Sequence, residues 1–202
     1  MIISTSENRR KPQQLKIGEK IFEGVTKFKY LGNVTDNGNQ VNECIKDRIQ
    51  AGNRAYAANY NILKSKSISR TSKLNIYRTL IRPVATYGAE SWAQTQNDEE
   101  VLNLFERKIL RKIYGPIQDK GEWRIRYNHE LEALQRKESI VRFIKAQRLR
   151  WAGHVMRMED NTMPKIIINA KLYSSRKKGR PKKKWIEGVT GDLTKIKVER
   201  WK

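Results

Sequence analysis

The sequence is short of the residues from which most metal centres and active sites are built. Its 202 residues include one cysteine, Cys44, and two histidines, His129 and His154. A lone cysteine excludes an intrachain disulfide and a cysteine-based zinc site, and it is typical of a reducing compartment, the nucleus or the cytoplasm. Neither histidine has a second histidine or a cysteine three or four residues away, so we expect one polar and one packed imidazole.

Clustered carboxylates and long apolar runs are missing too. The adjacent acidic pairs, Glu99-Glu100 and Glu159-Asp160, fall near the ends of predicted helices, where they do not form a cluster around two metal ions. No phosphate-binding loop and no nucleophile elbow is present. No apolar run reaches the roughly eighteen residues that a membrane span needs. We therefore expect no catalytic residue, no metal, no other cofactor and no membrane contact in this chain.

What the sequence has in excess is positive charge. Forty-three Lys and Arg residues face 21 Asp and Glu residues, for a net charge of +22. Residues 1–100 hold 16 basic and 10 acidic groups (net +6), and residues 101–202 hold 27 and 11 (net +16). Such a surface repels itself until a polyanion neutralises it, and nucleic acid is the usual polyanion. We favour nucleic acid over an anionic membrane, because the basic residues are mixed with aromatics and no lipidation motif is present.

Hydrophobic periodicity predicts a mainly α fold that begins with a small antiparallel β-hairpin or sheet. Strand-like alternation covers residues 13–35, and the turn signal Asp36-Asn37-Gly38 follows it. A helical stripe then runs from Val41 to Leu63. Further helices are expected over residues 69–83, 97–113, 128–134, 139–158 and 185–196.

Three local signals refine these elements. Ser69 is expected to cap the second helix, and Pro83 to interrupt or kink it. Asn97 and Glu100 have the spacing of a capping box for the third helix. We divide the chain into residues 1–39 (strands with a hairpin), 40–115 (a helical domain), 116–170 (a helical extension) and 171–202 (a basic, partly extended arm with a short terminal helix).

The first candidate binding motif is Phe28-Lys29-Tyr30-Leu31-Gly32. Aromatic rings that alternate with Lys29 on a strand can present a ring and a cation to a nucleic-acid strand, and Gly32 lets a backbone approach closely. The alternative is an ordinary strand with two core aromatics.

The second candidate is a set of basic residues on the outer faces of two helices. They surround apolar stripes, and those of the later helix lie in and around the segment Arg148–Met158. Trp151 within that segment is expected to be mostly a core anchor, and the arginines around it predict a face that tracks phosphates. The predicted nucleic-acid contacts are Arg107, Lys108, Arg111, Lys112, Arg142, Lys145, Arg150 and Arg157.

The third candidate is the basic arm, in which eight of the fourteen residues 171–184 are Lys or Arg. Its Gly-Arg-Pro core resembles an AT-hook, whose arginine enters the narrow minor groove of A·T-rich duplex. A nuclear localisation signal is the alternative, because that needs only the charge run. The residues concerned are Arg176, Lys177, Lys178, Gly179, Arg180, Pro181, Lys182 and Lys183.

These motifs together resemble a known family. Phe28-Lys-Tyr-Leu-Gly32 is similar to the primer-grip hairpin of reverse transcriptases from non-LTR (LINE-type) retrotransposons. The segment Ile81-Arg-Pro-Val-Ala-Thr-Tyr-Gly-Ala-Glu-Ser-Trp92 resembles the thumb helix of those enzymes. Arg150-Trp-Ala-Gly-His-Val-Met-Arg-Met158, Pro164-Lys165 and Gly179-Arg-Pro181 with Trp185 resemble their C-terminal tail.

The resemblance implies palm strands over residues 13–35, a thumb over residues 40–115 and a basic tail. The thumb would lie along a template–primer duplex that is read by its shape and backbone. The family's catalytic aspartates, with the Mg²⁺ that they hold, are absent, so this chain alone is expected to be inactive as an RNA-directed DNA polymerase. It would be a fragment, or a decayed or domesticated copy. Expected partners are RNA/DNA hybrid or duplex DNA, and the palm and fingers of a polymerase for catalysis in trans.

Overall fold

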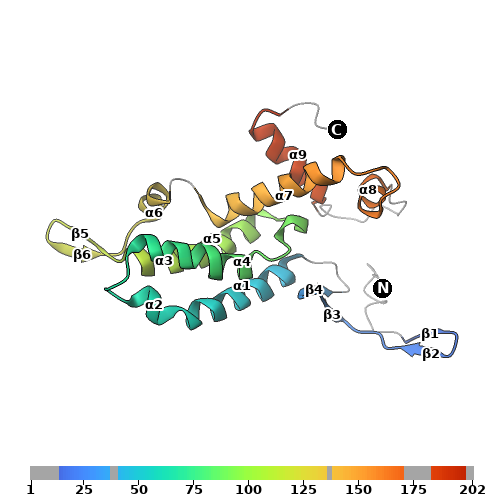
Figure 1. The fold of residues 1–202 in the computed structure, drawn as a ribbon, viewed down its shortest axis with the longest axis horizontal. Helices are drawn as coiled ribbons and strands as arrows, with labels where there is room; N and C mark the ends of the chain where they lie inside the picture. Colours follow the sequence, from blue (N-terminus) through green and yellow to red (C-terminus); the bar gives the residue numbers. More distant parts are fainter. Residues whose placement is uncertain (1–13, 37–40, 136–137, 171–182, 199–202) are drawn as a thin grey trace.

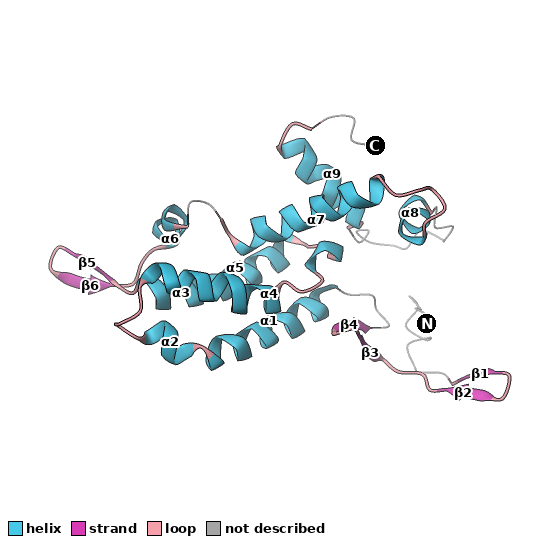
Figure 2. Cartoon of the chain, in the orientation of Figure 1, coloured by secondary structure: helices cyan, strands magenta, loops and turns pink. Residues whose placement is uncertain are grey.

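The computed structural model describes residues 14–36, 41–135, 138–170 and 183–198. Within these ranges the chain is mainly α, with small antiparallel hairpins, as the periodicity predicted. Figures 1 and 2 show an elongated molecule with a helical body, from which one hairpin projects at either end. Within the same ranges, no helix combines the length and the hydropathy of a membrane span.

The N-terminal strands form two separate hairpins rather than one sheet. Strands β1 (Leu15–Ile17) and β2 (Lys20–Phe22) pair with each other, and β3 (Lys27–Tyr30) pairs with β4 (Asn33–Asp36). The β3–β4 turn consists of Leu31 and Gly32, both with positive φ (46° and 81°). Two such residues match the right-handed twist of the strands, so this is a tight hairpin.

The long helical stripe that follows is interrupted once. Helix α1 (Val41–Ala58) ends at Asn59, and α2 (Tyr60–Lys64) continues after it. The side-chain amide of Asn59 donates to the Ala55 carbonyl at 2.9 Å. This hydrogen bond competes with the backbone hydrogen bonds of the regular helix. Leu63 is nevertheless fully buried.

The next helix changes its pitch before the proline, where a kink or break was expected. Ser69 caps α3 (Arg70–Ile76) by accepting from the Ser72 amide at 3.1 Å, as predicted. The helix continues as a π-helical turn (η2, Tyr77–Ile81) and then α4 (Arg82–Ala85), which contains Pro83. Proline lacks the N–H of a regular ladder, and a wider turn accommodates that loss. Gly88 then leads into the 3-10 turn η3 (Ala89–Ser91).

The predicted capping box of the third helix was placed two residues too late. Helix α5 (Gln96–Tyr114) begins at Thr95, whose hydroxyl accepts from the Asp98 amide, while Asp98 accepts from the Thr95 amide at 2.9 Å. Thr95 has the extended backbone that an N-cap requires, and it has an acid three residues on.

The second half of the chain adds one hairpin and four helices within the described ranges. Two of these elements were not predicted: the hairpin, whose turn contains Lys120 and Gly121 at positive φ, and α8. The bounds are β5 (Ile117–Asp119), β6 (Glu122–Arg124), α6 (Asn128–Leu134), α7 (Ile140–Met156), α8 (Met163–Asn169) and α9 (Trp185–Lys195).

A buried polar link ties the core helices together. The carboxylate of Glu106 on α5 accepts from the Tyr77 hydroxyl at 2.7 Å and from the Ile140 amide, at the start of α7, at 2.9 Å. Burial raises the pKa of Glu106 and raises the pKa of Tyr77 well above its ordinary value. Around this link, side chains of α1, η2, α5 and α7 form one hydrophobic core. The packing therefore fixes α7 across α5.

Arg148 forms a second buried joint, between α7, α9 and the segment after η3. Its side chain is 1% exposed; it pairs with Asp192 of α9 and donates to the Trp92 carbonyl at 3.4 Å. Gly188 leaves room for it, because a Cβ there would lie 3.1 Å from the guanidinium. Arg148 is therefore structural, although its segment suggested a phosphate-facing arginine.

Candidate functional site

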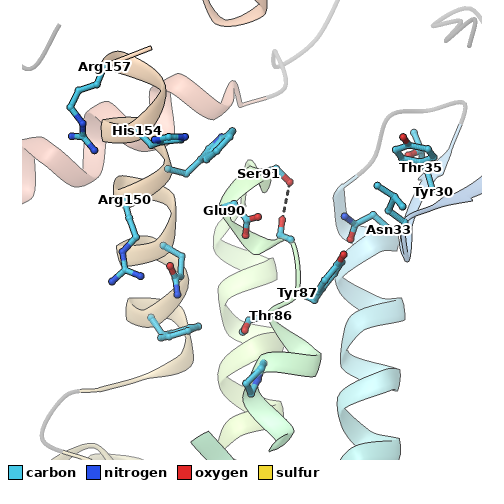
Figure 3. A pocket seen from close by; sticks show the side chains of 16 residues that line it. Tyr30, Asn33, Thr35, Thr86, Tyr87, Glu90, Ser91, Arg150, His154 and Arg157 are labelled. Atoms are coloured by element: carbon cyan, nitrogen blue, oxygen red, sulfur yellow. Dashed lines mark hydrogen bonds between the residues drawn. The ribbon is translucent and has the colours of Figure 1, made fainter. Parts of the chain in front are cut away.

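A cleft of about 1070 Å³ lies between the β3–β4 hairpin, the α4–η3 segment and one face of α7 (Figure 3). Each wall contains one of the three motifs that carried the family resemblance. The sequence separates these motifs by about fifty residues or more, and the fold brings them to one place.

The hairpin wall is held in place by Arg48 of α1. Arg48 donates to the Gly32 carbonyl and, at 3.2 Å, to the side-chain oxygen of Asn33. A Cβ at Gly32 would lie 2.7 Å from the Arg48 guanidinium, so the glycine leaves room for a side chain of the protein itself. The close approach of a nucleic-acid backbone to Gly32 stays a prediction. Tyr30 and Leu31 line the cleft beside it and are 64% and 71% exposed.

The floor of the cleft is the segment from Thr86 to Ser91. Gly88 has φ +72°, and a Cβ there would lie 2.7 Å from the Asn33 side chain, so a glycine lets the hairpin approach the floor. The guanidinium carbon of Arg48 lies 4.5 Å from the centre of the Tyr87 ring. Figure 3 shows Tyr87 pointing towards Asn33. Glu90 contributes one carboxylate to the same lining.

The α7 wall supplies cations at helical spacing. Phe143, Gln147, Arg150, His154 and Arg157 follow one another three or four residues apart, so they share one face of the helix. The arginines are exposed, and neither forms an ion pair with a carboxylate of the described residues. Seven residues separate them, a rise of about 10 Å along the axis.

Trp151 belongs to this wall rather than to the core. Its ring is half-buried, lies 5.5 Å from the ring of His154 and lines the cleft. The expectation of a core anchor was therefore wrong for this residue. The neighbouring positions Ala152 and Val155 are buried instead. The indole of Trp151 therefore lies where a ligand in the cleft can reach it.

The cleft has the chemistry of a binding site. Two unpaired arginines can contact phosphate oxygens, and the rings of Tyr30, Tyr87 and Trp151 offer apolar surface close to them. Among the described residues no three His, Cys, Asp or Glu side chains are grouped so that they could hold a metal ion.

The hairpin motif is exposed on strand β3. Phe28 is 49% exposed and its ring stacks on that of Tyr30 at 6.5 Å, so the alternative of two core aromatics is wrong. Between these two rings in the sequence, Lys29 forms an ion pair with Asp47 of α1 at 3.2 Å.

The predicted basic residues of α5 lie apart from the cleft. Lys108 and Lys112 face tyrosines of α1 and α2, and Arg111 donates to the Asn128 side chain at 2.7 Å. Arg107 is half-buried on the same helix.

Two predicted residues of α7 lie outside the cleft lining. Lys145 forms an ion pair with Glu99 at 2.9 Å, and Arg142 is exposed. The fold thus separates Arg150 and Arg157 from the other basic residues predicted on this helix.

Most of the predicted basic arm lies outside the described residues, which resume at Lys183. The Lys183 ammonium donates to the Gln94 carbonyl at 3.1 Å, and the Trp185 indole donates to the Glu90 carbonyl at 2.7 Å. The last residue of the arm's motif is therefore attached beside the floor of the cleft. The predicted contacts outside the described range are Arg176, Lys177, Lys178, Gly179, Arg180, Pro181 and Lys182.

Several cleft residues were not among the predicted contacts. Asn33, Tyr87, Trp151 and His154 all line it. Gln147, which also lines the cleft, was missed as well. The three- and four-residue spacing of Gln147, Arg150, His154 and Arg157 on one helix face could have indicated both Gln147 and His154. No sequence signal pairs Asn33 with Gly88.

Comparisons with known proteins add a transposon link. No family model matches the chain, and no solved structure matches it. The chain is similar to an uncharacterized transposon-derived protein of Caenorhabditis elegans, with 23% identity over 177 residues. The match covers 86% of this chain and 62% of that protein, so the chain spans less than two thirds of its relative's length.

Proposed function

We propose that this chain is a nucleic-acid-binding part of a transposon-derived protein, corresponding to the thumb and tail of a LINE-type reverse transcriptase. One observation carries the proposal: the hairpin, thumb-like and tail-like motifs line a single cleft. Their meeting brings exposed arginines and aromatic rings to one surface. The transposon-derived relative supports the same origin.

In this function the arginines of α7 bind the backbone of the nucleic acid. Arg150 and Arg157 project from one helix face and have no carboxylate partner in the part of the chain that the structure describes, so each can donate to phosphate oxygens. The exposed ring of Tyr30 and the half-buried ring of Trp151 lie against sugars or unpaired bases. Such contacts recognise shape and charge, and they select no base sequence.

The test is a salt titration of binding to a fluorescent RNA/DNA hybrid. The double variant Arg150→Gln/Arg157→Gln removes two phosphate contacts, so the slope of log K against log salt should become shallower by about 0.9 per contact. A matched control, Lys46→Gln/Arg78→Gln, removes the same charge from cations that already pair with Glu43 and Glu138.

We expect the control to bind nearly as the unmodified chain does. If both double variants lose the same slope, the cleft has no special role and the net charge alone drives binding. If the chain prefers A·T-rich duplex to hybrid, and the cleft variants bind that duplex normally, the basic arm is the main contact. The chain would then be a domesticated DNA- or chromatin-binding protein.

A further inference from the structure

A second basic surface lies on α5, away from the cleft, and it differs from other basic surfaces in how its cations are held. We name Lys108, Arg111 and Lys112 the α5 stripe; they fall within one sector of the helix. None of them lines the cleft. None forms an ion pair with a carboxylate among the residues that the structure describes.

Neutral groups hold these three cations in place. The Lys112 ammonium lies 4.6 Å from the centre of the Tyr60 ring and donates to the Tyr60 hydroxyl at 2.9 Å. The Lys108 ammonium lies 5.4 Å from the centre of the Tyr56 ring and 3.4 Å from the Asn53 side-chain oxygen. The two rings meet edge to face at 6.0 Å, so one aromatic pair orients both lysines. Ordering by neutral partners leaves the charge uncompensated.

Other lysines of the chain are arranged in the opposite way. Lys29, Lys46 and Lys145 pair with Asp47, Glu43 and Glu99. A paired lysine must break that contact before it binds a phosphate, whereas a lysine held on a tyrosine has already lost part of its rotamer freedom and keeps its full charge.

The surroundings of the stripe favour a polyanion. Between Asp47 and Asp98 the sequence has one acidic residue, Glu90, and Glu90 lies at the cleft. The lysine pair sits four residues apart on α5, with a rise of about 6 Å between them. Tyr60 remains 37% exposed, so the site is open to solvent.

We propose that the α5 stripe, oriented by Tyr56 and Tyr60, is a second binding surface for the sugar–phosphate backbone of nucleic acid. This inference rests on the proposed function in taking nucleic acid as the ligand, but it needs none of the cleft residues. Each tyrosine ring lies against one lysine ammonium, so the role that we assign to these rings is to orient the cations.

The experiment uses the full chain, the same fluorescent RNA/DNA hybrid and three further variants. Lys108→Gln/Lys112→Gln should make the slope of log K against log salt shallower by about 1.8, at 0.9 per contact. Lys27→Gln/Arg78→Gln removes the same charge from cations that pair with Glu43 and Glu138, and it should leave the slope nearly unchanged. Tyr60→Phe keeps the charge and the ring but removes the hydroxyl that holds Lys112, so affinity should fall about two- to fivefold at an unchanged slope.

Each outcome separates the two proposals. If the α5 variants bind like the control while Arg150→Gln/Arg157→Gln weakens binding, the second surface is refuted and the cleft stands. If only the α5 variants weaken binding, the cleft is refuted. A Tyr60→Phe variant that binds unchanged would refute the orienting role of the tyrosine. If the unmodified chain does not bind, both proposals fail. Circular dichroism establishes that each variant is folded.

Discussion

Removing the partner of Arg148 should destabilise the fold more than any change to a surface ion pair. The substitution Asp192→Ala leaves a guanidinium that is 1% exposed with only the Trp92 carbonyl as an acceptor, since its Nε already lacks a partner among the described residues. Breaking a buried ion pair in this way costs about 3–5 kcal/mol. That is a large part of the roughly 5–15 kcal/mol that stabilises a typical native protein.

The assay is urea unfolding followed by circular dichroism, with urea chosen because it does not screen charges. The matched control is Asp160→Ala. It also removes an aspartate from an ion pair, with Lys165, but the side chain of Asp160 is 92% exposed. The control should change the free energy of unfolding by no more than about 0.5 kcal/mol.

A second variant separates the lost charge from the lost packing. In Arg148→Met/Asp192→Leu no charge remains in the joint, and apolar side chains of similar length fill it. Such replacements are often neutral or stabilising, so most of the lost stability should return. A single variant that loses less than about 1 kcal/mol, or a double variant as unstable as the single one, would refute the reasoning.

Three further predictions address the packing, the pH dependence and the arm. Gly52→Ala should cost about 1–3 kcal/mol in urea unfolding, because its Cβ would lie 2.8 Å from the Phe105 ring and 2.9 Å from Ala85, whereas Gly191→Ala, with open space around it, should be stabilising; equal effects would contradict the steric cause. Hydrogen bonds from Lys27 and Lys46 lower the pKa of Glu43 to about 2, so the stability difference from Glu43→Gln should be constant above pH 4.5 and shrink as the pH falls towards 2; a difference that grows on acidification would be the wrong sign. In fluorescence anisotropy, Arg180→Ala should weaken binding to A·T-rich duplex more than to G·C-rich duplex, and Lys182→Ala should weaken both alike; an equal loss for Arg180→Ala would leave only a charge run.

The helices were predictable because their burial follows the period of the sequence. Ile140, Val141, Ile144 and Val155 were expected on one face of α7, and all four are buried. The same reasoning misplaced Trp151, because a large ring at the edge of a stripe can turn to either side.

Sequence reasoning missed features that depend on local backbone geometry, on very short strands or on tertiary contacts. The cap of α5 moved to Thr95 because local backbone geometry, and not spacing alone, selects the N-cap. The β5–β6 hairpin was missed because its strands are three residues long, too short for an alternating pattern. Each motif of the cleft was visible in the sequence. The motifs meet because α7 packs on α5, and because Gly88 has no side chain and therefore lets Asn33 lie against it.

The buried joint also bears on how such a chain can be shortened during evolution. Here a stop codon before Gly188 would remove Asp192 and leave Arg148 buried without its counter-ion. A shortened copy would be exposed to proteolysis because its body is destabilised. We therefore expect α9 to be needed for a stably folded product, because it supplies the buried counter-ion of Arg148.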